Sequence, residues 1–138
     1  MSNTPEDEVI LFANEAFYTA FASGDVDAMD KLWAHEHPCT CLHPGAPPLM
    51  EREEIMMSWQ HILADAGVTS IDMHSAKVIA SGDVALVVCI EALAGGALVA
   101  TNGFILEDGQ WRMILHQAGP CPDALGPDED EDDDPQVH

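Results

Sequence analysis

Residues 84–118 decide the fold: V-A-L-V-V-C-I-E-A-L-A at 84–94, A-L-V-A-T-N-G-F-I-L-E at 97–107 and Q-W-R-M-I-L-H-Q-A at 110–118. Each segment is rich in β-branched and apolar residues, and the turn signals Gly95-Gly96, Asp108-Gly109 and Gly119-Pro120 end them. Because connections this short join antiparallel neighbours, the stretch predicts a three-stranded meander. Both faces of the first segment are largely apolar, so we expect helices to cover one face and something else to cover the other.

Three polar residues interrupt this apolar surface, namely Glu91, Asn102 and His116. Burying a carboxyl, amide or imidazole group is costly unless the group is hydrogen-bonded or lines a wet cavity. Two interpretations follow. Either Glu91 faces solvent on a half-exposed sheet, or all three side chains point into one pocket.

Strand alternation makes the second interpretation specific. It places Ile114 on the face of His116, together with Arg112 and Ala118, and it places Trp111 and Met113 on the opposite face. Asn102 and Phe104 would share the face of His116, as would Glu91, and His43 would close the mouth. A slip of the register by one residue would instead turn these polar groups outward.

Composition limits the class of protein. A chain of 138 residues is long enough for one domain, which we expect to span residues 1–120. The net charge is −21, and eight of the 25 acids lie within residues 123–134, so we expect residues 121–138 to be a disordered acidic tail. The remaining 17 acids against four bases repel phosphates and anionic lipids, so we expect neither nucleic-acid nor membrane binding.

Location and redox state follow from two further features. The sequence has no run of 18 apolar residues and no apolar segment at its acidic amino terminus, so it predicts neither a transmembrane helix nor a signal peptide. The four cysteines lack a disulfide framework spacing, which favours reduced thiols and a cytoplasmic location.

The first half of the chain predicts helices. Thr4-Pro5-Glu6-Asp7 is a helix start, apolar residues then recur with the helical period, and Gly24 is a helix stop. We expect a second helix over 26–33, a short strand over 39–43, a third helix over 51–66 and a strand within 68–80. Because the helices precede the main strands, the class is α+β, with a curved antiparallel sheet wrapped around three helices.

The segment H-E-H-P-C-T-C-L-H is the one cluster of metal-ligating residue types in the sequence. Its spacing is not that of a common structural zinc site, and no second cluster follows it. Packing is therefore the expected role, and we expect no cofactor, while a metal-dependent protein remains an alternative. The cluster comprises His35, His37, Cys39, Cys41 and His43.

Several segments together carry a resemblance: F-A-S-G-D-V-D-A-M-D-K-L-W at 21–33, C-T-C-L-H-P-G-A at 39–46, S-G-D-V-A at 81–85 and A-T-N-G-F-I-L-E-D-G-Q-W-R-M-I-L-H-Q-A at 100–118. In this order and spacing they resemble a SnoaL-like protein of the nuclear transport factor 2-like superfamily. The resemblance implies a cone-shaped α+β fold with a deep pocket, and a homodimer formed through the outer face of the sheet.

Within that superfamily the comparison with ketosteroid isomerase shows three departures. The catalytic base aspartate, which precedes a proline, falls on His43, and the protonated aspartate of the oxyanion site falls on Asn102. The oxyanion tyrosine falls on Phe17, one residue from Tyr18. Gln117 stands where many SnoaL-like relatives carry a second histidine.

Three hypotheses of function follow. In the first, the protein binds a small apolar or enolisable molecule and acts as an isomerase or lyase by proton transfer. His43 would be the general base, Asn102 a donor to a developing oxyanion, and His116 or Glu91 the second proton carrier. The second is a non-catalytic ligand-binding or dimeric assembly domain, and the third is the metal-dependent protein. The residues expected to line the pocket are Phe17, Tyr18, Trp33, Trp59, Phe104 and Ile114.

Overall fold

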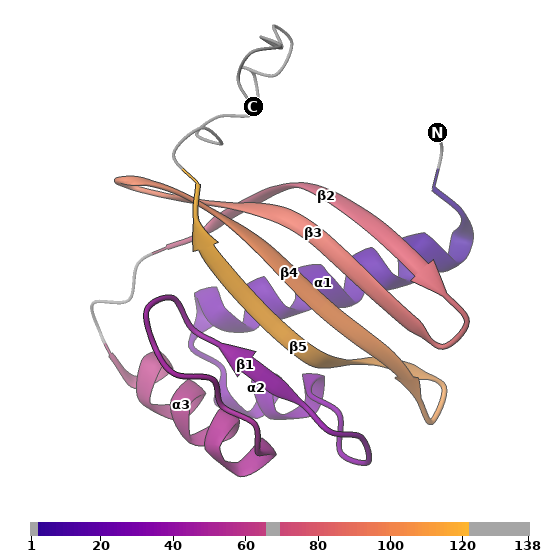
Figure 1. The fold of residues 1–138 in the computed structure, drawn as a ribbon, viewed down its shortest axis with the longest axis horizontal. Helices are drawn as coiled ribbons and strands as arrows, with labels where there is room; N and C mark the ends of the chain where they lie inside the picture. The colour runs from indigo at the N-terminus through magenta and orange to yellow at the C-terminus, as the bar shows by residue number, and fades with distance from the viewer. Residues whose placement is uncertain (1–2, 66–69, 122–138) are drawn as a thin grey trace, which may run out of the picture.

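The computed structural model describes residues 3–65 and 70–121. Within them the chain forms helices first and the long strands afterwards, as the sequence predicts (Figure 1). The helices are α1 (Pro5–Ser23), α2 (Val26–Leu32) and α3 (Arg52–Ala64). The strands are β1 (Thr40–Leu42), β2 (Asp72–Ser81), β3 (Val84–Leu93), β4 (Gly96–Glu107) and β5 (Gln110–Pro120). The predicted acidic tail, apart from Cys121, lies outside the described residues.

The ends of α1 follow from local chemistry. The Thr4 side chain accepts a hydrogen bond from the Asp7 N–H, and the Asp7 side chain accepts one from the Thr4 N–H, both at 3.1 Å. This reciprocal pair satisfies two backbone donors that the first turn of a helix leaves free. The helix ends at Gly24, whose φ of 64° is accessible to glycine without steric cost. The predicted start and stop of this helix are therefore confirmed.

The strands form one sheet in the order β1-β5-β4-β3-β2. Strands β3, β4 and β5 pair antiparallel through tight turns, which confirms the predicted meander. Strand β1, however, pairs parallel with β5, so the expectation of a wholly antiparallel sheet is wrong. A tight turn forces antiparallel pairing between neighbours in sequence, but no turn links β1 to β5, and their relative direction is therefore free. The sheet is open, because its edge strands β1 and β2 do not pair with each other.

A bulge interrupts the pairing of β4 with β5. Gly103 pairs with Leu115, whereas the next residue, Phe104, pairs with Met113, so Ile114 has no partner on β4. An extra residue of this kind reverses the alternation of side chains on the strand that contains it.

The bulge corrects one prediction of side-chain orientation. Trp111 and Met113 are buried together with His116, although uninterrupted alternation puts them on the opposite face. Arg112 and Ile114 are only partly buried and leave the face that we predicted them to share with His116.

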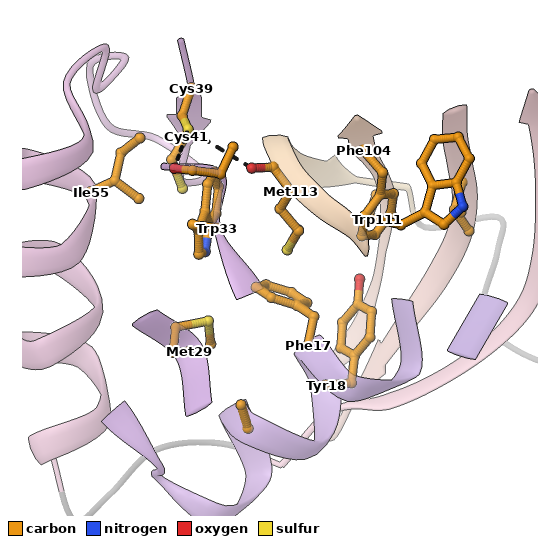
Figure 2. Close-up of a cluster of buried hydrophobic side chains, with 14 of the residues drawn as sticks. Phe17, Tyr18, Met29, Trp33, Cys39, Cys41, Ile55, Phe104, Trp111 and Met113 are labelled. Atoms are coloured by element: carbon orange, nitrogen blue, oxygen red, sulfur yellow. Dashed lines mark hydrogen bonds between the residues drawn. The ribbon is translucent and has the colours of Figure 1, made fainter. Parts of the chain in front are cut away.

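The core lies between the helices and one face of the sheet. Figure 2 shows Phe17 and Tyr18 of α1 facing Phe104, Trp111 and Met113 of the strands. The aromatic and aliphatic groups there are almost wholly buried. In Figure 1, α1 crosses behind the strands, and none of the described helices covers the face of the sheet toward the viewer. None of the described helices is long and apolar enough to cross a membrane.

Candidate functional site

A cavity of about 260 Å³ opens between α1, α3 and the inner face of the sheet. Three of the predicted polar residues, His43, Glu91 and His116, contribute to its wall, and the other lining groups are apolar. None of the four Lys and Arg residues of the chain is among the lining residues. The wall consists of Phe17, Phe21, His43, Pro44, Trp59, Ile62, Ile71, Glu91, Leu93, Leu98, His116 and Ala118.

Distant segments bring these groups together. The parallel pairing of β1 with β5 sets Cys41 opposite His116, and His43 follows two residues later. The ring centroids of His43 and His116 are consequently 6.4 Å apart. The ring of Trp59 lies 4.9 Å from that of His43 and 5.9 Å from that of His116, so the three rings form one side of the cavity.

A chain of hydrogen bonds behind the cavity wall joins Glu91 to His116. The Tyr18 hydroxyl donates to Glu91 Oε2 at 2.6 Å, and Asn102 Nδ2 donates to Tyr18 Oη at 3.0 Å. Asn102 Nδ2 also donates to Asn14 Oδ1 at 2.8 Å, and Asn102 Oδ1 lies 2.6 Å from His116 Nδ1. All five residues are buried, so each polar group replaces its lost water contacts with a protein partner.

Tyr18 and Glu91 are joined by a hydrogen bond from the phenol and not by an ion pair. Burial, the charge of Glu91 and the nearby Cys89 raise the pKa of Tyr18 far above its ordinary value, so the phenol remains protonated. Burial also raises the pKa of Glu91, and the hydrogen bond from Tyr18 opposes part of this rise. Figure 2 shows the Tyr18 hydroxyl directed from α1 toward the sheet.

The two imidazoles of the cavity are held in the neutral form. Burial, and then the repulsion that a protonated His43 would exert, lowers the pKa of His116 to about 3. Burial also lowers the pKa of His43. His43 Nε2 lies 3.0 Å from Ser58 Oγ and 3.5 Å from Cys41 Sγ, while Ser58 Oγ donates to the Ile55 carbonyl oxygen at 2.8 Å.

The structure assigns Asn102 a place different from the predicted one. Both N–H groups of its amide are used within the protein, by Asn14 Oδ1 and Tyr18 Oη, and Asn102 does not line the cavity. In this arrangement Asn102 offers no free N–H group to an oxyanion in the cavity, and its amide contacts Asn14, Tyr18 and His116 instead.

The predicted pocket-lining residues fall into two groups. Phe17 and Trp59 line the cavity. The other four do not line it. Tyr18 lies behind the wall and is hydrogen-bonded to Glu91, and Trp33 and Phe104 are fully buried in the core. The bulge turns Ile114 away from the face of His116. Trp33 and Phe104 lie on the same side of the sheet as the cavity, but other side chains of the core surround them completely.

Two residues that shape the site were not predicted, Asn14 and Ser58. Asn14 lies four residues before Tyr18 on the buried stripe of α1, so a polar residue within that stripe was the available signal. Ser58 comes directly before Trp59 in α3, and no sequence signal connects it to His43, which belongs to a different segment.

The metal-ligating residue types between His35 and His43 have separate partners in the structure. The buried carboxylate of Glu107 accepts hydrogen bonds from the His35 and Glu36 N–H groups at 2.9 and 2.8 Å, and its Oε2 lies 2.8 Å from His37 Nδ1. His43 lies instead at the cavity. Across residues 3–65 and 70–121, no three His, Cys, Asp or Glu side chains are grouped so that they could hold a metal ion.

Known proteins match this chain both in sequence and in fold. The family model of the SnoaL-like domain matches residues 10–122. The "putative dehydratase from the NTF2-like family" of Streptomyces avermitilis is 30% identical, covers 86% of this chain and 99% of its own, and superposes with a TM-score of 0.78. The "putative calcium/calmodulin-dependent protein kinase type II association domain" of Thiobacillus denitrificans is 31% identical over 86% of this chain and 95% of its own, with a TM-score of 0.71.

A curated relative is longer than this chain. The F-box protein SKIP8 of Arabidopsis thaliana is 25% identical over 111 residues, which are 79% of this chain and 48% of that protein. The chain thus spans about half the length of the curated relative it matches. The family match, the order of elements and the open curved sheet agree, and the chain belongs to the SnoaL-like domain family, within the NTF2-like proteins.

Proposed function

We propose that the protein binds a small, largely apolar molecule in the 260 Å³ cavity and moves a proton on it, as an isomerase or a lyase. The observation that carries this proposal is the composition of the cavity wall. Two neutral imidazoles and one carboxyl group are set into an otherwise apolar surface. Such groups are the usual donors and acceptors of protons in enzymes.

His43 is the general base of this proposal. Its Nε2 is held by Ser58, which fixes the ring, and burial keeps the ring neutral and able to accept a proton. His116 is a poorer base, because a group with a pKa of about 3 scarcely holds a proton near neutral pH. We therefore assign His116 to orienting the bound molecule rather than to proton transfer.

Glu91 is the acid of this proposal. Burial favours its protonated form, and an apolar site of this kind keeps a carboxylic acid available as a proton donor closer to neutral pH. Tyr18 holds one carboxyl oxygen, so the other is available to the cavity that Glu91 lines. His43 would take a proton from carbon, and Glu91 would deliver one to the substrate.

The Streptomyces avermitilis relative supports this class of reaction. A dehydratase, the activity in that protein's name, removes a proton and a hydroxyl group, and therefore requires a base and an acid. At 30% identity over 86% of this chain, the relative makes a lyase as well supported as an isomerase.

Deuterium exchange tests the proposal. The protein is incubated in heavy water with a panel of small cyclic β-hydroxy ketones, and uptake of deuterium at carbon is followed by mass spectrometry. We expect His43→Asn and Glu91→Gln each to slow the exchange about 100-fold or more. His61→Asn, a change at an exposed histidine of α3, is the matched control and should leave the rate unchanged. Compounds that bind in the cavity but exchange no faster than in buffer would contradict the catalytic proposal.

Assembly is the second candidate function. The Thiobacillus denitrificans relative carries the name of an association domain, and the outer face of the present sheet is rich in half-buried and exposed apolar groups such as Val88 and Ile90. We propose that a second copy of the chain covers this face in a homodimer. Assembly and ligand binding use opposite faces of the sheet, so the two candidates do not exclude each other.

A further inference from the structure

The hydrogen bonds around the cavity determine which nitrogen of each imidazole carries a hydrogen, and hence what the cavity offers a ligand. The ligand preference that follows rests on the proposed function, because the same cavity is the ligand site. Two contacts set the starting point: the Met73 thioether lies near the Asn14 amide, and the Ser58 hydroxyl donates to the Ile55 carbonyl oxygen.

The Met73 thioether fixes the amide of Asn14. A thioether sulfur accepts hydrogen bonds and cannot donate them. Asn14 Nδ2 lies 3.9 Å from Met73 Sδ, so this side of the amide is the NH₂ side, and Oδ1 faces Asn102. Asn14 Oδ1 therefore accepts from Asn102 Nδ2, at 2.8 Å.

The amide of Asn102 then fixes His116. With its NH₂ group directed at Asn14 Oδ1 and Tyr18 Oη, Asn102 presents its oxygen to the imidazole. Because an amide oxygen only accepts, His116 Nδ1 must carry the hydrogen of this 2.6 Å bond. In a neutral ring the other nitrogen, Nε2, then holds a lone pair, and no described residue is hydrogen-bonded to this nitrogen.

Ser58 fixes His43 in the opposite tautomer. The single hydrogen of the Ser58 hydroxyl is donated to the Ile55 carbonyl oxygen, so Oγ accepts from His43 Nε2. The hydrogen of His43 is therefore on Nε2, where Cys41 Sγ at 3.5 Å is a second, weaker acceptor, and Nδ1 holds the lone pair. Among the described residues, Nδ1 also has no partner.

We infer that the ligand of the cavity is a neutral molecule with an apolar frame that presents a hydroxyl or N–H donor to His116 Nε2. To His43 Nδ1 it presents a proton-bearing group, which in a substrate is the C–H to be removed and in a simple ligand is an O–H or N–H. A ligand that offers only acceptors would face two lone pairs and leave them unsatisfied, which costs free energy in a buried site. An anionic ligand meets the additional opposition of a chain with net charge −21, and no Lys or Arg side chain in the wall offsets that charge.

Three probes of nearly the same shape test this inference: 2-naphthol, 2-methoxynaphthalene and 2-naphthoate. They offer a hydrogen-bond donor, an acceptor alone and an anion, and the cavity exceeds the roughly 150 Å³ that is enough to bind benzene. Dissociation constants are measured by NMR titration with the full chain. We expect 2-naphthol to bind about tenfold more tightly than either of the others, the effect of one well-formed hydrogen bond.

The ring tautomers are read independently from long-range ¹H–¹⁵N spectra. The expected pattern is Nδ1–H for His116 and Nε2–H for His43. Ser58→Ala removes the acceptor that fixes His43 and should reduce the preference for 2-naphthol, whereas His61→Asn should not change it. The opposite tautomers, or equal affinity for naphthol and its methyl ether, would overturn the inference and leave the proton-transfer proposal standing. Tighter binding of naphthoate would overturn it as well. Failure of all three probes to shift cavity resonances would overturn both.

Discussion

His116 is the residue for which burial most changes the chemistry. Its folded pKa is about 3, against about 6.5 for an unperturbed histidine. Below pH 6.5 this histidine is therefore protonated in the unfolded chain but remains neutral in the folded protein. Its contribution makes the free energy of unfolding fall as the pH falls toward 3. Glu91 acts in the opposite direction, because its raised pKa lets the folded state bind a proton first.

Because these two contributions to the free energy of unfolding oppose each other, the test must follow one residue at a time. We expect the ¹⁵N resonances of the His116 ring to stay those of a neutral imidazole from pH 7.5 down to about pH 5 in the folded protein. A midpoint for this ring between those values would show that the hydrogen bonds behind the cavity do not hold it as the structure indicates.

Glu107 anchors the segment that follows α2. Burial by itself raises its pKa, but the His35 N–H, the His37 ring and the Glu36 N–H together outweigh burial and lower the pKa to about 2. The carboxylate thus stabilises the fold above the unfolded pKa near 4.3, and this stability is lost as the pH falls through about 2.

Replacing Glu107 with Gln keeps the shape and removes the charge. We expect the free energy of unfolding at pH 7 to fall by about 1.5–3 kcal/mol, the range for hydrogen bonds to a charged group. We also expect the variant to lose less stability than the wild type between pH 5 and pH 2, as measured by urea denaturation. Glu15→Gln, the same change at an exposed position of α1, is the control. Equal losses in the two variants would contradict the anchoring role.

At the scale of elements, β4 and β5 approach each other closely beside the bulge on β5. A Cβ atom at Gly103 would lie 3.0 Å from Leu115 Cβ and 3.4 Å from Leu86 Cδ2. Because Leu115 Cβ is held by the backbone, Gly103→Ala should lower the free energy of unfolding by about 1–3 kcal/mol. Chemical denaturation measures this loss.

Gly95→Ala provides the comparison. No atom lies within 4 Å of a Cβ atom built at Gly95, so this change should be neutral or slightly stabilising by restricting the unfolded chain. If the two alanine variants proved equally stable, close packing at Gly103 would not be what sets the register of the bulge.

At the scale of the whole molecule, the proposed homodimer concerns the outer face of the sheet. Val87, Cys89 and Glu91 are buried on the inner face, so the alternate residues Val88 and Ile90 project from the outer one. Val88→Glu would place a charge in the centre of that interface, in a chain whose net charge is already −21.

Light scattering at micromolar concentration tests the assembly. We expect the wild type to have the mass of two chains and Val88→Glu the mass of one. Val9→Glu makes the same substitution at an exposed position of α1 and should stay dimeric. A wild-type mass near 14.9 kDa would contradict the proposed homodimer.

Short-range chemistry is what the sequence by itself determined. Thr4 and Asp7 begin α1, Gly24 ends it, and the turns after β3 and β4 make the meander, because each of these signals acts within a few residues. The sequence also singled out Glu91, Asn102 and His116, and it left open whether they point into one pocket or outward; of these, Asn102 and His116 occupy paired positions of β4 and β5. The order of these elements was enough to predict the α+β class, and the family was indicated by the resemblance of several sequence segments in their order and spacing.

Only the tertiary structure decided what depends on contacts between distant segments. The bulge at Ile114 arises from how β4 and β5 pair, and a single extra residue exchanges the faces of Met113 and Ile114. The parallel pairing of β1 with β5, which brings His43 to His116, has no local signal. The use of both Asn102 N–H groups depends on Asn14 and Tyr18, more than 80 residues earlier in the chain. Hydrogen-bond partners are set by position in space, and a sequence pattern records only which residues could take part.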